Sequence, residues 1–274
     1  MLRIFALSLA LLLSGQAFAQ TSSVPGELLK NTRRQNGDQI NVCFDTSSVI
    51  SAFDHEIAQA IGDALFLKVN PVEGFGGFPV NGDGFMDELM LAMNNTCDIF
   101  MGVSVQTNSP FPEWASVTRP YATIPFVLAV EDASWNSWAD IPRDRKIGTA
   151  LQSVGELVYI TWSLQQPEAE RWKRLPYADN KLMAKRVLDG TLGGMLLWQP
   201  ALRKLQSEQP ETEALRVIEL APVPATAIKV GAVVSSRDTF LRTQVDQAID
   251  ALVADGTIAA LLEKYGYTGE AGDQ

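Results

Sequence analysis

The stretch that decides the fold runs from Thr96 to Val130 and reads TCDIFMGVSVQTNSPFPEWASVTRPYATIPFVLAV. Two short apolar runs, Ile99–Val103 and Ile124–Val130, lie near its two ends. A loop rich in Pro, Ser and Asn separates them, and the phrase TRPY, residues 118–121, leads into the second run. Short apolar runs between turn signals are typical of strands that are buried on both faces. The stretch therefore predicts an α/β fold.

Three phrases in the chain resemble one known family. A helix with Leu89, Met90 and Met93 on one stripe leads into a turn, a buried strand, a long loop and a second buried strand. Residues 53–61, FDHEIAQAI, and residues 255–266, DGTIAALLEKYG, follow the same family pattern. With the order of helices and strands, the chain over residues 39–268 resembles the periplasmic solute-binding proteins of family 3, the amino-acid-binding superfamily.

The wording CDIFMGV…TRPY, together with Trp198-x-Pro200, looks closer to one branch of that family. This is the branch associated with PQQ-dependent methanol/alcohol dehydrogenases (MoxJ/XoxJ type). The resemblance implies an α/β, two-lobed type 2 periplasmic binding protein fold with two hinge crossings. It implies an N-terminal segment at 20–36, lobe one at 37–127 plus 232–268, lobe two at 132–227, crossings at 128–131 and 228–231, and a tail at 269–274.

The first residues read as a secretion signal. The sequence MLRIFALSLALLLSGQAFAQ has one Arg, an apolar run over Ile4–Leu13, and Ala17-Phe18-Ala19 as a small-x-small cleavage site. This pattern predicts a signal peptide over residues 1–19, cleaved after Ala19, because the apolar run is too short to span a bilayer. We expect a periplasmic protein that does not span the membrane.

Composition limits the class of partner. The chain has 274 residues, of which 46% are hydrophobic and 20% charged, and its net charge is −10. Such a chain can bury a substantial core and is not a disordered one. An acidic protein without a basic block is a poor binder of nucleic acid, so no nucleic-acid partner is expected. The acidic excess either suits a cationic partner or serves solubility.

Export also decides how the two cysteines are interpreted. Cys43 lies in the expected strand Ile40–Phe44, and Cys97 opens the phrase CDIFMGV. In a sheet of order 2-1-3 these strands are neighbours, which predicts a Cys43–Cys97 disulfide in an oxidising compartment. The alternative is two buried free thiols. Neither cysteine is expected to be catalytic.

Signals of catalysis are missing from the sequence. The one histidine, His55, lies early in a helix, where a surface position is expected. A single His cannot form HExxH, and two cysteines 54 positions apart do not form a zinc site. The glycine-rich stretch over residues 73–84 follows no strand–GxGxxG–helix or Walker pattern. The sequence therefore predicts a protein that is not an enzyme, with no metal and no cofactor.

The starts of two expected helices are relevant to where a ligand could bind. Ser51-x-x-Asp54 predicts a capping box at the start of the first helix. Residues 152–156, QSVGE, begin a helix that continues to Leu164. In the family, this second helix points its free amides into the cleft, where they can hold a carboxylate. A helix cap without any ligand fits the residues equally well.

The resemblance places a ligand- or partner-binding cleft between the two lobes, at strand C-termini and helix N-termini. The family usually holds a ligand carboxylate with an Arg in a T-x-x-R phrase, but residues 104–108, SVQTN, contain none. Arg119 is then either a displaced clamp or a plain surface or interlobe residue. The residues expected to face the cleft are Asp45, Thr46, Val103, Ser104, Thr118, Arg119, Tyr121, Gln152, Ser153, Trp198 and Gln199.

Two functions remain from the sequence. The first is a non-catalytic periplasmic accessory protein whose partner is a quinoprotein methanol/alcohol dehydrogenase. The missing clamp, the Trp198-x-Pro200 phrase and the cysteine pair favour it. The alternative is the substrate-binding receptor of an ABC transporter, which delivers a small polar solute such as an amino acid to a permease.

Overall fold

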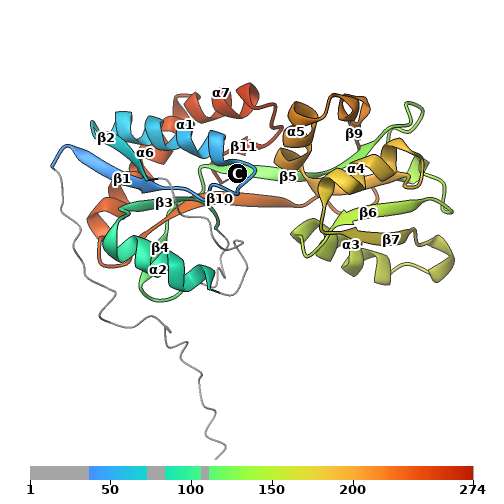
Figure 1. Ribbon diagram of the computed structural model, residues 1–274, viewed down its shortest axis with the longest axis horizontal. Helices are drawn as coiled ribbons and strands as arrows, with labels where there is room; N and C mark the ends of the chain where they lie inside the picture. The colour runs from blue at the N-terminus through green and yellow to red at the C-terminus, as the bar shows by residue number, and fades with distance from the viewer. Residues whose placement is uncertain (1–36, 73–83, 106–110, 274) are drawn as a thin grey trace, which may run out of the picture.

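The protein forms two α/β lobes that lie side by side and are joined by two long strands (Figure 1). The computed structural model describes residues 37–72, 84–105 and 111–273. The predicted signal peptide and the segment 20–36 lie outside these residues, as does most of the glycine-rich stretch. The α/β fold class is confirmed. No helix in the described ranges is both long and apolar enough to cross a membrane.

Lobe one takes the beginning and the end of the chain. Its sheet is covered by α1, α6 and α7 on one face and by α2 on the other (Figure 1). Its elements are β1 (Gln39–Cys43), α1 (Ser51–Ala64), β2 (Lys68–Val72), α2 (Phe85–Asn95), β3 (Ile99–Ser104), β4 (Ala115–Val117), α6 (Thr239–Ala254), α7 (Thr257–Lys264) and β11 (Glu270–Ala271).

Lobe two takes the middle of the chain. The sequence predicts most of its helices and strands but misses β7, a five-residue strand, KRLPY, that is partly exposed. Its elements are η2 (Trp138–Asp140), β6 (Lys146–Ala150), α3 (Val154–Leu164), η3 (Glu168–Glu170), β7 (Lys173–Tyr177), α4 (Asn180–Leu188), β8 (Gly194–Trp198), α5 (Gln199–Glu208), η4 (Pro210–Ala214) and β9 (Arg216–Ile218).

The joining strands are β5 (Ala122–Val130) and β10 (Ala227–Ser235). β5 pairs with β10 and β11 up to Pro125, and with β8 and β9 from Phe126 onward. One continuous strand therefore supplies ladder hydrogen bonds to both lobes. The main strand order is β2-β1-β3-β10-β5-β8-β6-β7.

Strand direction decides where a site can form. β5 runs from lobe one into lobe two and β10 runs back, antiparallel to it. β3 is antiparallel to β10 and β1 is parallel to β3, so both run toward lobe two. β8 is antiparallel to β5, and β6 and β7 share its direction, so these three run toward lobe one. The C-terminal strand ends of the two lobes therefore face each other, where α/β folds bind ligands.

The disulfide between Cys43 and Cys97 is confirmed, with the two Cα atoms 5.7 Å apart. The reason is the predicted one: β1 lies between β2 and β3, so the two cysteines are brought together by neighbouring strands. The bond is buried in the core between the sheet and α2.

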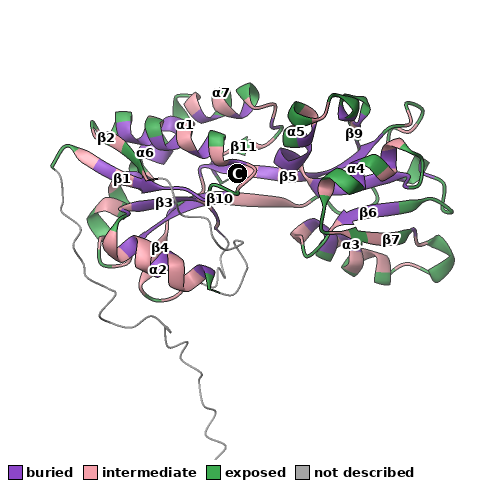
Figure 2. Cartoon of the chain, viewed as in Figure 1, coloured by how far each residue is buried: buried purple, intermediate pink, exposed green. Residues whose placement is uncertain are grey.

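Each lobe has its own apolar core on either side of its sheet. Figure 2 shows the buried residues concentrated on the central strands and on the inner sides of the helices. In lobe two, Trp138, Tyr159 and Trp172 pack together under α3, with the Trp138 and Tyr159 rings stacked at 5.0 Å. Burying large aromatic side chains in this way supplies much of a domain's stability.

The predicted capping box at the start of α1 is wrong. The residue before the helix is Ile50, and no side chain caps the helix. Asp54 does not bond back to the helix start, because its carboxyl group turns into the core and meets Tyr121. Its neighbour His55 is partly exposed, and its ring stacks on Phe44 at 3.6 Å.

Candidate interlobe binding site

Asp45, two residues beyond the end of β1, is a buried acid with one unsatisfied oxygen. Asp45 is 5% exposed, and its Oδ1 atom accepts hydrogen bonds from the Ser47 amide at 2.8 Å and the Ser47 hydroxyl at 2.6 Å. Its Oδ2 atom is buried and meets no hydrogen-bond donor in the described part of the chain. Leaving a buried acceptor without a donor is costly, and more so for a charged one. A ligand N–H group would remove this cost.

Asp45 lies at the boundary between the lobes. It lies two residues beyond the end of β1, which runs toward lobe two. Four residues later, Val49 packs against the main core clusters of both lobes. The loop between β1 and α1 therefore reaches across the boundary, and Asp45 and Thr46 are brought there together.

A second acid lies behind Asp45. The Asp54 Oδ1 atom accepts a hydrogen bond of 2.6 Å from the Tyr121 hydroxyl, which in turn accepts one of 3.1 Å from the Gly102 amide. Gly102 has φ +80°, and a Cβ atom there would lie 2.4 Å from Asp54 Oδ2, so only glycine fits. Burial raises the pKa of Asp54 to about 8; the hydrogen bond from Tyr121 opposes this rise, and the charge of Asp45 adds to it.

The N-terminus of α3 is occupied by the chain itself. Glu156 accepts hydrogen bonds from the Thr149 hydroxyl and the Gln152 amide, both at 2.7 Å, and forms an ion pair with Arg174. Ser153 caps the helix by accepting from the Glu156 amide at 3.1 Å. The place where the resemblance implies a ligand carboxylate therefore holds an internal carboxylate.

Trp198 and Gln199 make contacts between the two lobes beside the joining strands. The Trp198 indole N–H donates to the Ile124 carbonyl at 3.0 Å, and its ring packs against cores of both lobes. The Gln199 side chain is buried and exchanges two hydrogen bonds with Thr268, of 2.9 and 2.8 Å. These contacts fasten the start of α5 to the C-terminal segment.

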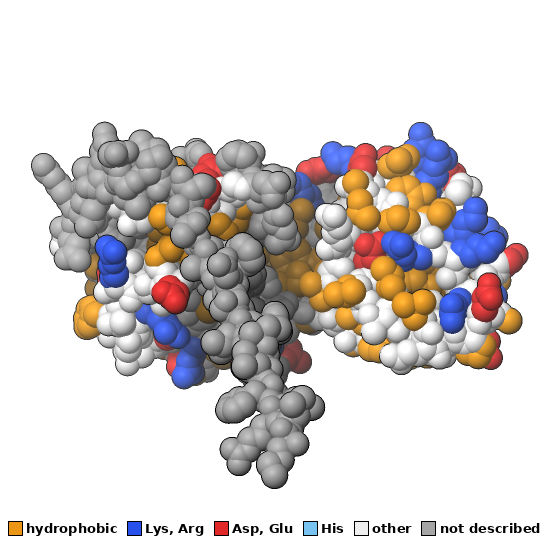
Figure 3. All heavy atoms as spheres, turned by 90° about the horizontal axis from the view of Figure 1, so that it is seen from below, with side chains coloured by type: hydrophobic (Ala, Val, Ile, Leu, Met, Phe, Trp, Pro, Cys, Tyr) orange, Lys and Arg blue, Asp and Glu red, His pale blue; other side chains and the backbone are white. Residues whose placement is uncertain are grey.

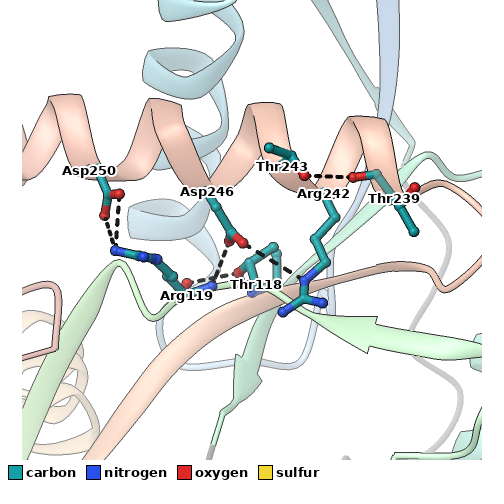
Figure 4. Close-up of polar contacts among 8 residues, drawn as sticks. Thr118, Arg119, Thr239, Arg242, Thr243, Asp246 and Asp250 are labelled. Carbon is teal, nitrogen blue, oxygen red and sulfur yellow. Dashed lines mark hydrogen bonds and ion pairs between the residues drawn. The ribbon is translucent and has the colours of Figure 1, made fainter.

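Arg119 is held against α6 of lobe one. Its Nη1 atom lies 3.0 Å from Asp250, and its amide donates to Asp246 at 2.7 Å (Figure 4). Thr118 accepts a hydrogen bond from the Ala232 amide at 2.9 Å and donates to the Arg119 carbonyl at 2.8 Å. Both residues therefore join the chain before β5 to α6 and β10.

The structure divides the predicted cleft residues into two groups. At strand or helix ends on the boundary lie Asp45, Thr46, Ser104, Gln152, Ser153, Trp198 and Gln199. Inside lobe one or against α6 lie Val103, Thr118, Arg119 and Tyr121.

Asp54, Glu156 and Arg174 were missed as parts of this region. Ser153-x-x-Glu156 is a capping-box spacing that could have identified Glu156. Nothing in the sequence pairs it with Arg174.

The two arginines considered so far are both held in ion pairs. Arg119 is bound to Asp250 and Arg174 to Glu156. In the described ranges, no group of three His, Cys, Asp or Glu residues is placed to hold a metal ion.

No protein-family model and no curated protein matches the sequence. Solved structures do match the fold. The open form of substrate-binding domain 2 of Lactococcus lactis GlnP matches with a TM-score of 0.65 at 14% identity, over 85% of this chain and 97% of that one. The unliganded, open L-cystine receptor of Neisseria gonorrhoeae matches with a TM-score of 0.63 at 19% identity, over 87% and 97%.

A third match is an ancestral cationic amino acid solute-binding protein, AncCDT-1, with a TM-score of 0.62 at 19% identity, over 88% of this chain and 98% of that one. Another structure of AncCDT-1 is described as a precursor of cyclohexadienyl dehydratase. At these identities the likeness shows a shared fold, that of the two-lobed type 2 periplasmic binding proteins.

Proposed function

We propose that this protein is a periplasmic solute-binding protein of an ABC transporter, and that it binds a small organic cation between its lobes. The observation that carries the proposal is the buried Oδ2 atom of Asp45, which has no donor among the described residues. An ammonium or guanidinium group would supply both the missing hydrogen bond and the opposite charge.

The pairing of Arg119 and Arg174 supports the same ligand class. A carboxylate taken out of water needs charge-assisted donors, and a bidentate Arg is the strongest of these. Arg119 and Arg174 are already paired, and the α3 N-terminus holds Glu156. An amine or guanidine without a carboxylate therefore suits this boundary better than an ordinary amino acid does.

Two of the structural neighbours are described as binding positively charged amino acids, which supports a ligand with positive charge. AncCDT-1 is described as a cationic amino acid binder, and ArtJ from Geobacillus stearothermophilus as an arginine-, lysine- and histidine-binding protein. The lobes at 37–127 plus 232–268 and at 132–227, with hinge crossings at 128–131 and 228–231, belong to the same proposal. Closure about these crossings would bury the ligand.

A thermal-shift screen tests the proposed ligand class. A ligand that binds only the folded state raises the melting temperature as its concentration exceeds Kd. We expect cations without a carboxylate, such as putrescine and agmatine, to raise it, and glutamate and glucose to leave it unchanged. A shift with glutamate and none with the cations would contradict the proposal.

A second function is favoured by one surface. Leu151, Leu157 and Leu164 are 47%, 63% and 66% exposed on and beside α3. Figure 3 shows apolar side chains gathered on this face of lobe two, with basic side chains near them. Exposed apolar patches mark protein–protein contacts. This patch, with the phrases noted in the sequence, supports an accessory protein that docks on a PQQ-dependent methanol/alcohol dehydrogenase.

The two functions give different results in one assay. An accessory protein raises the activity or the yield of active quinoprotein dehydrogenase when the two are produced together. Substituting Leu157→Asp would remove that effect, whereas Phe240→Asp, at an apolar residue of lobe one that is 75% exposed, would not. A transport receptor has no effect on the dehydrogenase in either form.

A further inference from the structure

A second pocket lies between the lobes, beside the loop that carries Asp45. It has a volume of about 710 Å³ and is lined by residues of that loop, including Thr46, by α1 and α7 of lobe one and by α5 of lobe two. Figure 1 shows these three helices on the same side of the molecule. Pockets of this size hold small organic ligands. Among the residues that line it are His55, Arg203, Lys204, Lys264, Tyr265 and Tyr267.

The charges that line this pocket do not cancel. Lys264 pairs with Glu56 at 2.7 Å, and Glu208, the one acid in the lining, pairs with Lys181 at 2.9 Å. Arg203 and Lys204 form no ion pair within the described ranges. Two positive charges are therefore left in a pocket of a protein whose net charge is −10.

The Arg203 guanidinium is held in place before any ligand arrives. Its Nε atom donates to the Gly266 carbonyl at 2.9 Å, and its Nη1 atom donates to Gln206 Oε1 at 3.0 Å. A guanidinium has five N–H donors in a fixed plane, so further donors remain. A donor group that is already ordered loses less entropy when it binds an anion.

Aromatic rings form the lobe-one wall. Tyr265 is fixed by a hydrogen bond of 2.7 Å to Glu56, and its ring lies 5.8 Å from that of Tyr267. Tyr267 in turn packs edge-on against Phe53 at 5.6 Å. These rings are held in place by the contacts named, and the basic residues of α5 line the same pocket.

We propose that this pocket binds a small organic anion with multiple negative charges, phosphate or carboxylate. Arg203 and Lys204 hold its charged groups, and Tyr265 and Tyr267 contact its carbon skeleton. The site is a second one, beyond the cation site proposed at Asp45. Because its walls come from both lobes, a bound anion also fixes the angle between them.

Calorimetric titration of the full mature chain tests the site with four probes: citrate, glycerol 3-phosphate, inorganic phosphate and neutral glycerol. We expect saturable binding of citrate or glycerol 3-phosphate, which weakens as NaCl is added, and no binding of glycerol. Comparison of the first two separates a carboxylate ligand from a phosphate ligand. Inorganic phosphate shows whether the charged group alone is sufficient.

Lys204→Gln is the decisive variant, because Lys204 makes no ion pair in the described part and its loss leaves the fold intact. We expect it to weaken anion binding about three- to tenfold. The matched control Lys173→Gln, on the exposed edge of β7, should leave the affinity unchanged. Arg203→Lys, which keeps the charge and loses the planar donors, should weaken binding as well.

Two results would overturn the proposal: no saturation by any anion below about 10 mM, or equal affinity in Lys204→Gln and the unmodified chain. The Asp45→Asn variant separates the two sites. It should retain anion binding even if the proposed cation site proves absent.

Discussion

The hydroxyl of Tyr121 donates a hydrogen bond of 2.6 Å to Asp54, a carboxyl group that is 2% exposed. This contact joins the first turn of α1 to the residue before β5, 67 positions later in the chain. The Gly102 amide donates to the same hydroxyl and adds β3 to the network. Three elements of lobe one are therefore fixed to one another directly behind Asp45.

Removing this hydroxyl should cost stability. Tyr121→Phe leaves the Gly102 amide and one Asp54 oxygen without their partner inside the core. We expect the free energy of unfolding to fall by about 1–3 kcal/mol, measured by urea denaturation. Tyr177→Phe is the matched control, because the Tyr177 hydroxyl has no hydrogen bond in the described ranges, and it should change stability by less than about 0.5 kcal/mol. Equal effects would contradict the account.

Asp54 should also make stability depend on pH. Its pKa is raised from 3.8 to about 8, so between these values the unfolded chain loses a proton that the folded chain keeps. Its contribution to stability is therefore complete below pH 3.8 and is lost as the pH rises to about 8. The free energy of unfolding of the unmodified chain minus that of Asp54→Asn should decline across this window, by at most about 6 kcal/mol.

The control for this titration is Asp63→Asn, at an exposed position of the same helix. The decline expected for Asp54→Asn is measured relative to this control. A difference that is the same for both variants at every pH would contradict the account.

The sequence predicts the elements better than it predicts the contacts. Thr239–Ala254 is a helix with the predicted bounds, because its apolar residues recur with helical spacing and Asp238 caps it. The Cys43–Cys97 bond was also predictable, since it needs only strand order and export. The strand β7 was not, because it is a short, partly exposed edge strand that begins with Lys173 and Arg174 and includes Pro176.

The contacts of the candidate site were also predictable only in part. Asp45 was predictable as an acid at the end of a buried strand. The role of Arg119 was not, because its partner Asp250 is 131 positions away and only the packing of α6 brings them together. The pairing of Asp54 with Tyr121 likewise depends on tertiary contact, so the local Ser51-x-x-Asp54 spacing was misleading.

The Cys43–Cys97 bond should contribute strongly to stability. It closes a loop of 54 positions, and in the chain-entropy model a loop of this length stabilises the folded state by about 4 kcal/mol. We expect the double variant Cys43→Ala/Cys97→Ala to lose roughly that amount in urea denaturation. Thiol titration of the denatured, unreduced protein should find no free thiol, and two thiols per chain would contradict the assignment.

The internal carboxylate at α3 can be tested by replacing it. Glu156→Ala leaves Arg174, Thr149 and the Gln152 amide without their shared acceptor, and we expect a loss of about 2–4 kcal/mol. Added formate should raise the melting temperature of this variant more than that of the unmodified chain, because it can occupy the vacated place. Exposed Glu168→Ala is the control and should show neither effect. No response to formate would mean that these donors do not form an anion site.

The most direct test of the central claim, a cation bound at Asp45, is calorimetric titration of the mature protein with agmatine, putrescine, arginine and glutamate. We predict saturable binding of at least one cation, no binding of glutamate, and a loss of about tenfold or more in cation affinity in Asp45→Asn. The control Asp144→Asn, at an exposed position of lobe two, should bind as the unmodified chain does. Glutamate binding with a micromolar Kd that persists in Asp45→Asn, with no cation bound, would contradict the account.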